Sequence, residues 1–181
     1  IRNAHNEVKR ASILQRLLEA PSLRPLAPLF AACYGPISDV VLAAPGFPLA
    51  PFASEEGVQQ GDGLATAGFC VGVHPEVCSL DAAVARAGGA ARFFSDDGYV
   101  VGPCGAVFPA IAAFAASILP LGLELREDKC CCFSPAPSLL QDTARPPQFP
   151  LGAAEGGGTA WSWPASPSET KSLWRIFWMT R

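Results

Sequence analysis

The chain has 181 residues, and half of them are hydrophobic, which is enough to bury one sizeable core. Only 16% of the residues are charged, against about 25% in typical globular proteins, and the net charge is −3. This balance excludes a free-standing protein that binds nucleic acid through an excess of positive charge. If the chain contacts nucleic acid, most of the electrostatic attraction must come from other parts.

The first third of the chain is predicted to hold two helices and one strand. Apolar residues at helical spacing predict an amphipathic helix that Pro21 ends; they are Val8, Ala11, Leu14, Leu17 and Leu18. A second short helix is expected over Leu23–Cys33, with Pro25 near its start and Gly35 at its end. We expect a strand over Asp39–Ala43 and a Pro-rich loop over Ala44–Ser54.

The middle of the chain is predicted to alternate helices with short strands. A glycine-rich loop, Gly57–Gly63, precedes a long helix over Leu64–Ala87, with Pro75 as a point where it could break and Gly88 and Gly89 at its end. The elements expected next are a hairpin of Ala90–Ser95 and Tyr99–Val101 around Asp96-Asp97-Gly98, a helix over Cys104–Leu119, and a strand pair of Leu121–Arg126 and Lys129–Ser134.

The uncharged run from Gly98 to Leu123 is long enough to cross a membrane, which takes about 20 apolar residues. Three prolines interrupt it, and Ala and Gly outnumber Leu and Ile. We therefore predict a strand followed by a buried Ala-rich helix and no membrane contact, with a small membrane protein as an alternative.

The seven cysteines show no metal-ligand spacing among themselves or with His5 and His74. This pattern predicts reduced thiols in an intracellular protein, with no disulfide partner and no structural zinc site. Residues 1–20 carry charges throughout, so we expect no cleavable signal peptide there.

Asp96 and Asp97 are adjacent carboxylates within the apolar run Phe93–Val101. One interpretation is a solvated Asp-Gly turn, which is a favoured hairpin connection. The other is metal binding, because polymerases transfer nucleotides with two Mg²⁺ ions, and Mg²⁺ is held by one or two carboxylates together with phosphates and water. Two adjacent carboxylates repel each other unless a cation or solvent relieves them.

Two further segments favour the metal-binding interpretation. The run Glu55–Leu64 (EEGVQQGDGL) lies upstream, with Gln60 36 residues before Asp96. The run Leu121–Cys130 (LGLELREDKC) lies downstream, with Lys129 32 residues after Asp97. Each has a plain alternative as a glycine loop or a strand pair, but this order and spacing of all three is hard to obtain by chance.

Together these segments resemble the palm motifs of reverse transcriptases, especially those of non-long-terminal-repeat retroelements. The resemblance covers residues 1–134. It implies that Asp96 and Asp97 bind Mg²⁺ and are catalytic, with Phe94 as the aromatic residue before them. It also implies that Gln60 and Gly61 lie against the template and the incoming nucleotide, although the family usually has proline where Gly63 stands.

Two more residues are assigned by the resemblance. Lys129 is the candidate general acid that protonates the pyrophosphate leaving group. His5 occupies the position of the aromatic residue that screens the sugar 2′ carbon, where phenylalanine is more usual. His5 has the alternative interpretation of a residue that packs at the start of the first helix.

The resemblance implies an α+β fold with a palm-like antiparallel sheet and helices packed on one face. Residues 135–181 are predicted to be a disordered tail, because residues 135–168 are rich in Pro, Ser, Gly and Ala with no periodic pattern. The tail also has an interpretation as a frameshifted stretch, and Trp161–Arg181 holds all four tryptophans without an amphipathic pattern. The implied function is RNA-directed DNA synthesis with RNA or DNA template–primer and dNTP as partners.

We expect the chain by itself to be inactive. In the family pattern the first catalytic aspartate would immediately precede Ile1, and the fingers and thumb would lie outside residues 1–134. The alternative is a non-catalytic palm-fold interaction module in which the aspartates are incidental.

Overall fold

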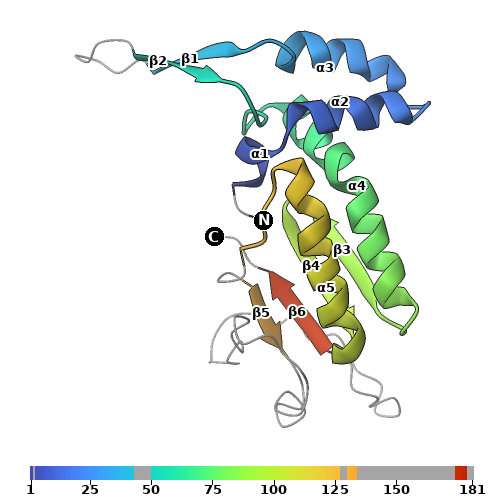
Figure 1. Ribbon diagram of the computed structural model, residues 1–181. Coiled ribbons are helices and arrows are strands. Elements are labelled where there is room, and N and C mark those ends of the chain that lie inside the picture. Colours follow the sequence, from blue (N-terminus) through green and yellow to red (C-terminus); the bar gives the residue numbers. More distant parts are fainter. Residues whose placement is uncertain (2, 43–49, 127–129, 134–173, 179–181) are drawn as a thin grey trace. The chain divides into compact units, whose positions relative to one another are not determined.

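The structure is a computed structural model that describes residues 1, 3–42, 50–126, 130–133 and 174–178 (Figure 1). In these ranges the chain is a mixture of helices and two small antiparallel sheets, which confirms the α+β class at this coarse level. The chain divides into two compact units. Unit 1 is Ile1–Pro75 with Ser117–Leu125, and unit 2 is Glu76–Ala116 with Arg126–Arg181.

Unit 1 begins with helical segments. These are α1 (Ala4–Glu7), α2 (Arg10–Glu19), the 3₁₀ helix η1 (Arg24–Leu26) and α3 (Ala27–Tyr34). Both η1 and α3 have a proline in the first turn, where the missing N–H has no helical partner in any case. The helix predicted before Pro21 and the helix predicted over Leu23–Cys33 are thus confirmed.

The buried face of α2 differs from the predicted one. Arg10, Ile13 and Leu17 are buried, whereas Leu18 is 48% exposed and Ala11 is also exposed. The buried residues follow the three- and four-residue spacing of one helix face. Leu17 is buried as predicted, but the apolar pattern did not include Arg10, whose guanidinium group finds hydrogen-bond acceptors in the fold.

Strands β1 (Ser38–Leu42) and β2 (Ala50–Ser54) form an antiparallel pair in unit 1, with Ser38 opposite Ser54. The β1 prediction is confirmed, but the loop predicted over Ala44–Ser54 is wrong for its last five residues. Residues 43–49 lie outside the described ranges. A two-stranded ribbon leaves one side of each strand unpaired, so β2 can contain Pro51, which has no N–H to donate.

Helix α4 (Gly63–Ala85) is continuous through Pro75, so the break considered for this position does not occur. Buried residues precede and follow the proline, and their packing offsets the single hydrogen bond that it removes. In unit 1, a Cβ atom on Gly68 would meet the Phe30 ring at 2.9 Å, and one on Gly72 would meet Ile13 at 3.0 Å. These glycines therefore allow α4 to lie close to α2 and α3.

The strand predicted over Leu121–Arg126 is wrong. The 3₁₀ helix η2 (Leu119–Leu121) leads to Gly122, which has a left-handed backbone with φ of +81°. The Lys9 N–H donates to the Leu121 carbonyl at 2.8 Å, and a Cβ atom on Gly122 would meet the Glu7 carbonyl oxygen at 2.5 Å. This segment therefore packs against the α1–α2 connection of unit 1 instead of extending a sheet.

Unit 2 contains a four-stranded antiparallel sheet with the order β3-β4-β6-β5. The strands are β3 (Ala90–Phe94), β4 (Asp97–Gly102), β5 (Cys130–Phe133) and β6 (Trp174–Trp178). The predicted hairpin is confirmed, and β5 confirms part of the strand predicted over Lys129–Ser134. Within the tail predicted to be disordered, the aromatic and β-branched segment Trp174–Trp178 pairs with β4 and β5. The other residues of this tail lie outside the described ranges.

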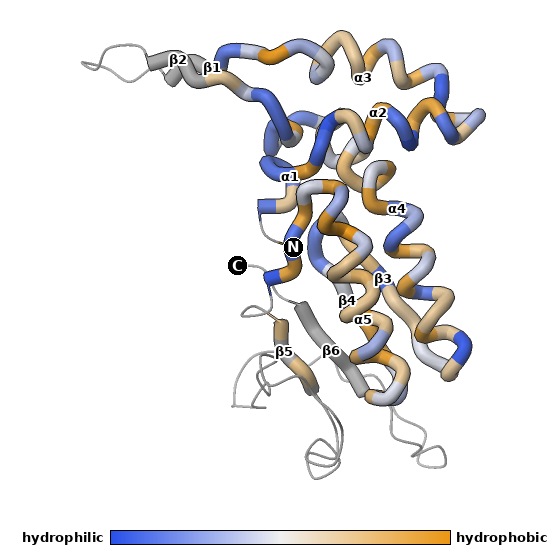
Figure 2. Tube along the Cα trace, in the orientation of Figure 1, coloured by the Kyte–Doolittle hydropathy of each residue, from blue (hydrophilic) through white to orange (hydrophobic). Residues whose placement is uncertain are grey.

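Helix α5 (Cys104–Ile118) confirms the predicted Ala-rich helix, and Figure 2 shows apolar residues along it. The window Cys104–Leu121 has the length and mean hydropathy, 2.0, of a membrane-spanning helix, and 44% of it is buried in the fold. Apolar core helices of soluble proteins have the same properties. In unit 2 the Phe114 ring of α5 packs against Phe93 of β3, with the ring centroids 5.4 Å apart.

Candidate functional site

The predicted site residues lie in two groups. His5, Gln60 and Gly61 belong to unit 1, whereas Phe94, Asp96 and Asp97 belong to unit 2. Lys129, the predicted general acid, lies outside the described residues.

The β3–β4 hairpin places both aspartates at its tip. Phe94 is paired with Asp97, so Ser95 and Asp96 are the two residues of the turn. The connection is therefore not the Asp-Gly turn considered from the sequence, because Asp97 and Gly98 already belong to β4. Ser95 has a left-handed backbone with φ of +56°, as the first turn residue of a tight hairpin requires.

The two faces of this hairpin differ in burial. Gly98 and Val100 are buried and alternate along β4 with Asp97 and Tyr99, which are half-buried. A Cβ atom on Gly98 would meet the Phe93 ring at 2.6 Å, so Gly98 leaves the space that this ring occupies over the strand. Since successive side chains of a strand point to opposite faces, Asp97 lies on the face opposite the one that packs against α5.

Carboxylate oxygens such as those of Asp96 and Asp97 are the ligands that hard divalent cations prefer, and both residues are half-buried at the hairpin tip. Among the residues that the structure describes, no group of three or more His, Cys, Asp or Glu side chains is placed to hold a metal ion. With two carboxylates alone, a Mg²⁺ ion would have to take most of its ligands from phosphate and water oxygens.

In unit 1, the start of the glycine-rich loop is held by backbone hydrogen bonds to the α1–α2 region. The Gly57 N–H donates to the Val8 carbonyl at 3.0 Å, and the Val58 N–H donates to the His5 carbonyl at 2.5 Å. Gly57 has φ of +72°, and a Cβ atom there would collide with the backbone of Asn6. The loop and the start of the chain thus approach each other at a point that only glycine allows.

His5 is brought to this loop by its backbone and to α4 by its side chain. Its ring stacks on Phe69, with centroids 4.8 Å apart and planes inclined by 28°. Phe69 is fully buried, and His5 is half-buried. Both interpretations of His5 are therefore compatible with its position, because one face of its ring packs on Phe69 while the residue stays partly exposed.

The end of the loop is held by Asp62 and Tyr34. The Leu64 N–H donates to Asp62 Oδ1 at 3.0 Å, which satisfies one of the free N–H groups at the start of α4. The Tyr34 hydroxyl donates to Asp62 Oδ2, and the Gln59 N–H donates to the Tyr34 oxygen at 3.4 Å. The Tyr34 and Leu64 hydrogen bonds lower the pKa of Asp62, while burial and the Asp62 hydrogen bond raise the pKa of Tyr34.

These shifts predict how the Tyr34→Phe substitution depends on pH. The stability contributed by Asp62 is present above its ordinary pKa of 3.8 and is lost as the pH falls through the lower folded value. The contribution of Tyr34 is present below its ordinary pKa of 10.0 and is lost as the pH rises through the higher folded value. In urea unfolding from pH 2 to 11, we expect Tyr34→Phe to be less stable than wild type at neutral pH. The difference between their free energies of unfolding should become smaller near pH 2 and near pH 11. A difference in free energy of unfolding that does not change with pH would contradict this prediction.

Gln60 and Gly61 lie between these two fixed ends. Both are exposed, and Gly61 has φ of +92° with no atom within 4 Å of the position of a Cβ atom. The predicted template-contacting residues thus lie on a surface turn whose flanks are held by the fold.

Arg10 was not predicted as a site residue, yet its side chain binds the start of this loop and the residue at the end of β2. It is 8% exposed and donates to the Gly57 carbonyl at 2.7 Å and the Ser54 carbonyl at 2.9 Å. The signal in the sequence is its spacing of three and seven residues from Ile13 and Leu17, which places a charged residue on an apolar helix face.

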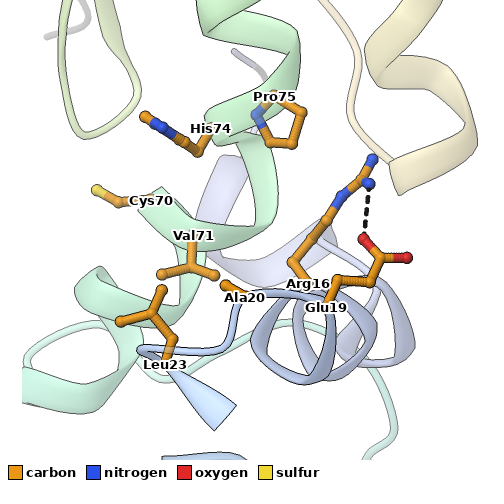
Figure 3. A pocket seen from close by; sticks show the side chains of 8 residues that line it. All are labelled: Arg16, Glu19, Ala20, Leu23, Cys70, Val71, His74 and Pro75. Atoms are coloured by element: carbon orange, nitrogen blue, oxygen red, sulfur yellow. Dashed lines mark hydrogen bonds and ion pairs between the residues drawn. The ribbon is translucent and has the colours of Figure 1, made fainter.

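A hollow of about 470 Å³ lies elsewhere in unit 1, between α2 and α4 (Figure 3). It is lined by Arg16, Glu19, Ala20, Leu23, Cys70, Val71, His74 and Pro75. None of the predicted site residues lines it. Burial raises the pKa of the Cys70 thiol, which favours the protonated, unreactive form at neutral pH.

No protein-family model matches this chain, and no curated protein or solved structure matches it either.

Proposed function

We propose that this chain is a palm portion of a reverse transcriptase, an RNA-directed DNA polymerase of the non-long-terminal-repeat type. The observation that carries the proposal is the β3–β4 hairpin, in which Asp96 and Asp97 lie at the tip beside the exposed Phe94. The proposed palm-like sheet is the antiparallel sheet of unit 2, with α5 packed on one face and Asp97 on the other.

The strained turn supports a functional role for the hairpin tip. A left-handed backbone costs a residue other than glycine about 1–2 kcal/mol, and Ser95 takes this conformation between Phe94 and Asp96. Strain of this kind is concentrated at functional sites, where the surrounding structure holds it in place. The Phe93–Phe114 contact supplies such support on the buried face.

The loop of unit 1 supports the second part of the proposal, contact with template–primer. Gln60 and Gly61 are exposed, while hydrogen bonds on both sides fix the backbone that carries them. An exposed amide side chain and exposed backbone groups can donate hydrogen bonds to phosphate, sugar and base atoms. An ordered loop loses less conformational entropy on binding than a flexible one.

Asp96 and Asp97 would hold the Mg²⁺ ion, and bound Mg²⁺ would neutralise the charge on the phosphates of the nucleotide. The chain's own contribution is to keep the two carboxylates at adjacent positions at the tip of the β3–β4 hairpin. Because the described residues contain no group of three or more potential metal ligands, the direct test is binding of the cation, not turnover.

Isothermal titration with Mn²⁺ and Mg²⁺ tests this proposal. We expect the wild-type chain to bind with a dissociation constant of about 1 mM or weaker, and both Asp96→Asn and Asp97→Asn to weaken binding by about tenfold. Each substitution keeps the size of the side chain and removes one anionic ligand.

Asp39→Asn is the matched control, because Asp39 is an exposed aspartate of β1 in unit 1 and should not affect binding. Equal, weak binding by wild type and all three variants would reject the metal site. That result would favour the alternative function, a non-catalytic interaction module in which the aspartates are incidental.

A further inference from the structure

Arg10 is a charged side chain buried in unit 1 beside the glycine-rich loop. Its Nε donates to the Gly57 carbonyl at 2.7 Å, one terminal nitrogen donates to the Ser54 carbonyl at 2.9 Å, and the other donates to Ser54 Oγ at 2.7 Å. Three nitrogens of one planar group therefore bind three acceptors on the segment that enters the loop.

Two further contacts join the same elements. The backbone N–H of Arg10 donates to Glu56 Oε2 at 3.0 Å, so a carboxylate from the loop side lies at the first turn of α2. The Arg10 guanidinium carbon lies 5.6 Å from the centre of the Tyr34 ring, within the range of a cation–π contact.

Arg10 and Tyr34 together contact both ends of the loop. Arg10 binds the incoming side at Ser54 and Gly57, while the Tyr34 hydroxyl binds the outgoing side at Gln59 and Asp62. The contact between the guanidinium group and the ring joins the two sets of hydrogen bonds. The exposed Gln60 and Gly61 lie between them.

We infer that Arg10 is a positioning residue, which sets the conformation of the Gln60–Gly61 turn and thereby its affinity for template–primer. The role in template binding rests on the proposed function, whereas the role in ordering the loop does not. Lysine cannot replace arginine here, because an ammonium group has neither the planar fork that meets three acceptors nor the flat face that stacks on Tyr34.

Arg10→Lys tests the inference, with Arg16→Lys as the matched control on the same helix. Both variants keep the net charge, and Arg16 forms a surface ion pair with Glu19 at 3.1 Å (Figure 3). Amide hydrogen exchange over residues 54–62 reports the order of the loop. Fluorescence anisotropy with a labelled RNA–DNA template–primer and Mn²⁺ reports binding.

We expect Arg10→Lys to speed exchange of the Gly57, Val58 and Gln59 amides by about tenfold, since hydrogen bonds to charged groups are among the stronger ones. Template–primer binding should weaken by about tenfold, and Gln60→Ala should weaken binding less in the Arg10→Lys background than in wild type. A residue with a merely structural role would lower the unfolding midpoint without this dependence on Gln60.

If the loop amides of the Arg10→Lys variant exchange at the wild-type rate, the inference is overturned. It is also overturned if Arg10→Lys and Gln60→Ala weaken template–primer binding independently, so that their effects add. If the wild-type chain does not bind the template–primer, the proposed function is rejected, and exchange alone decides whether Arg10 orders the loop. If Arg10→Lys does not fold, Ser54→Ala removes one acceptor and should produce a smaller increase in exchange; no increase would overturn the inference.

Discussion

Gly57→Ala is expected to lower the free energy of unfolding by about 3 kcal/mol or more. Two effects add together at this position. The backbone has φ of +72°, which costs a residue with a Cβ atom about 1–2 kcal/mol, and that atom would collide with the backbone of Asn6. Because the obstruction is backbone, it cannot be relieved by a change of rotamer, so the contact between the loop and the α1–α2 region must open.

Gly61→Ala is the matched control in the same loop. Its backbone is also left-handed, with φ of +92°, but no atom lies within 4 Å of the new Cβ position. We expect a loss of about 1 kcal/mol from the backbone alone. Urea unfolding followed by circular dichroism measures both variants, and equal losses would show that the approach of Gly57 to Asn6 does not contribute.

Phe69→Ala is expected to cost about 3–5 kcal/mol of unfolding free energy. Phe69 is 0% exposed and lies at the centre of unit 1, where its ring also stacks on His5. The substitution leaves a cavity and removes the surface that orients the His5 ring. The unfolding midpoint in urea measures the loss.

Phe94→Ala is the control for this substitution, because Phe94 is 82% exposed. We expect its unfolding free energy to change by no more than about 0.5 kcal/mol. If the proposed function holds, the same variant should weaken binding of the template–primer, since exposed aromatic side chains stack on bases. A large loss of stability with Phe94→Ala would show that the residue has a structural role at the hairpin tip.

Most helices could be predicted from local signals. The spacing of apolar residues, together with Pro21, Gly88 and Gly89, predicted α2 and α4 because helix periodicity and helix ends depend on neighbouring residues. The β3–β4 hairpin was also predicted, since two apolar runs flank a short polar segment. The Asp-Gly pair suggested a different turn, however. The register that places Ser95 and Asp96 in the turn depends on how Phe93 packs over Gly98.

Elements that depend on distant partners were not predicted. β2 contains Pro51 and forms only because β1 pairs with it, and β6 comes from a segment far along the chain that pairs between β4 and β5. Leu121–Arg126 was predicted as a strand, but Leu121 ends η2 and accepts a hydrogen bond from the Lys9 N–H instead. Such partners lie far apart in the sequence, so they cannot be predicted from local composition.

The sequence by itself determined where the candidate site residues would be: a pair of aspartates at a hairpin and a glutamine in a glycine-rich loop before a long helix. Only the tertiary structure decided what holds them. It buried Arg10, joined it to Ser54 and Gly57, and brought Tyr34 onto Asp62. The physical reason is that a buried guanidinium group is stable only where several acceptors converge, and folding brings those acceptors from residues more than 40 positions away in the chain.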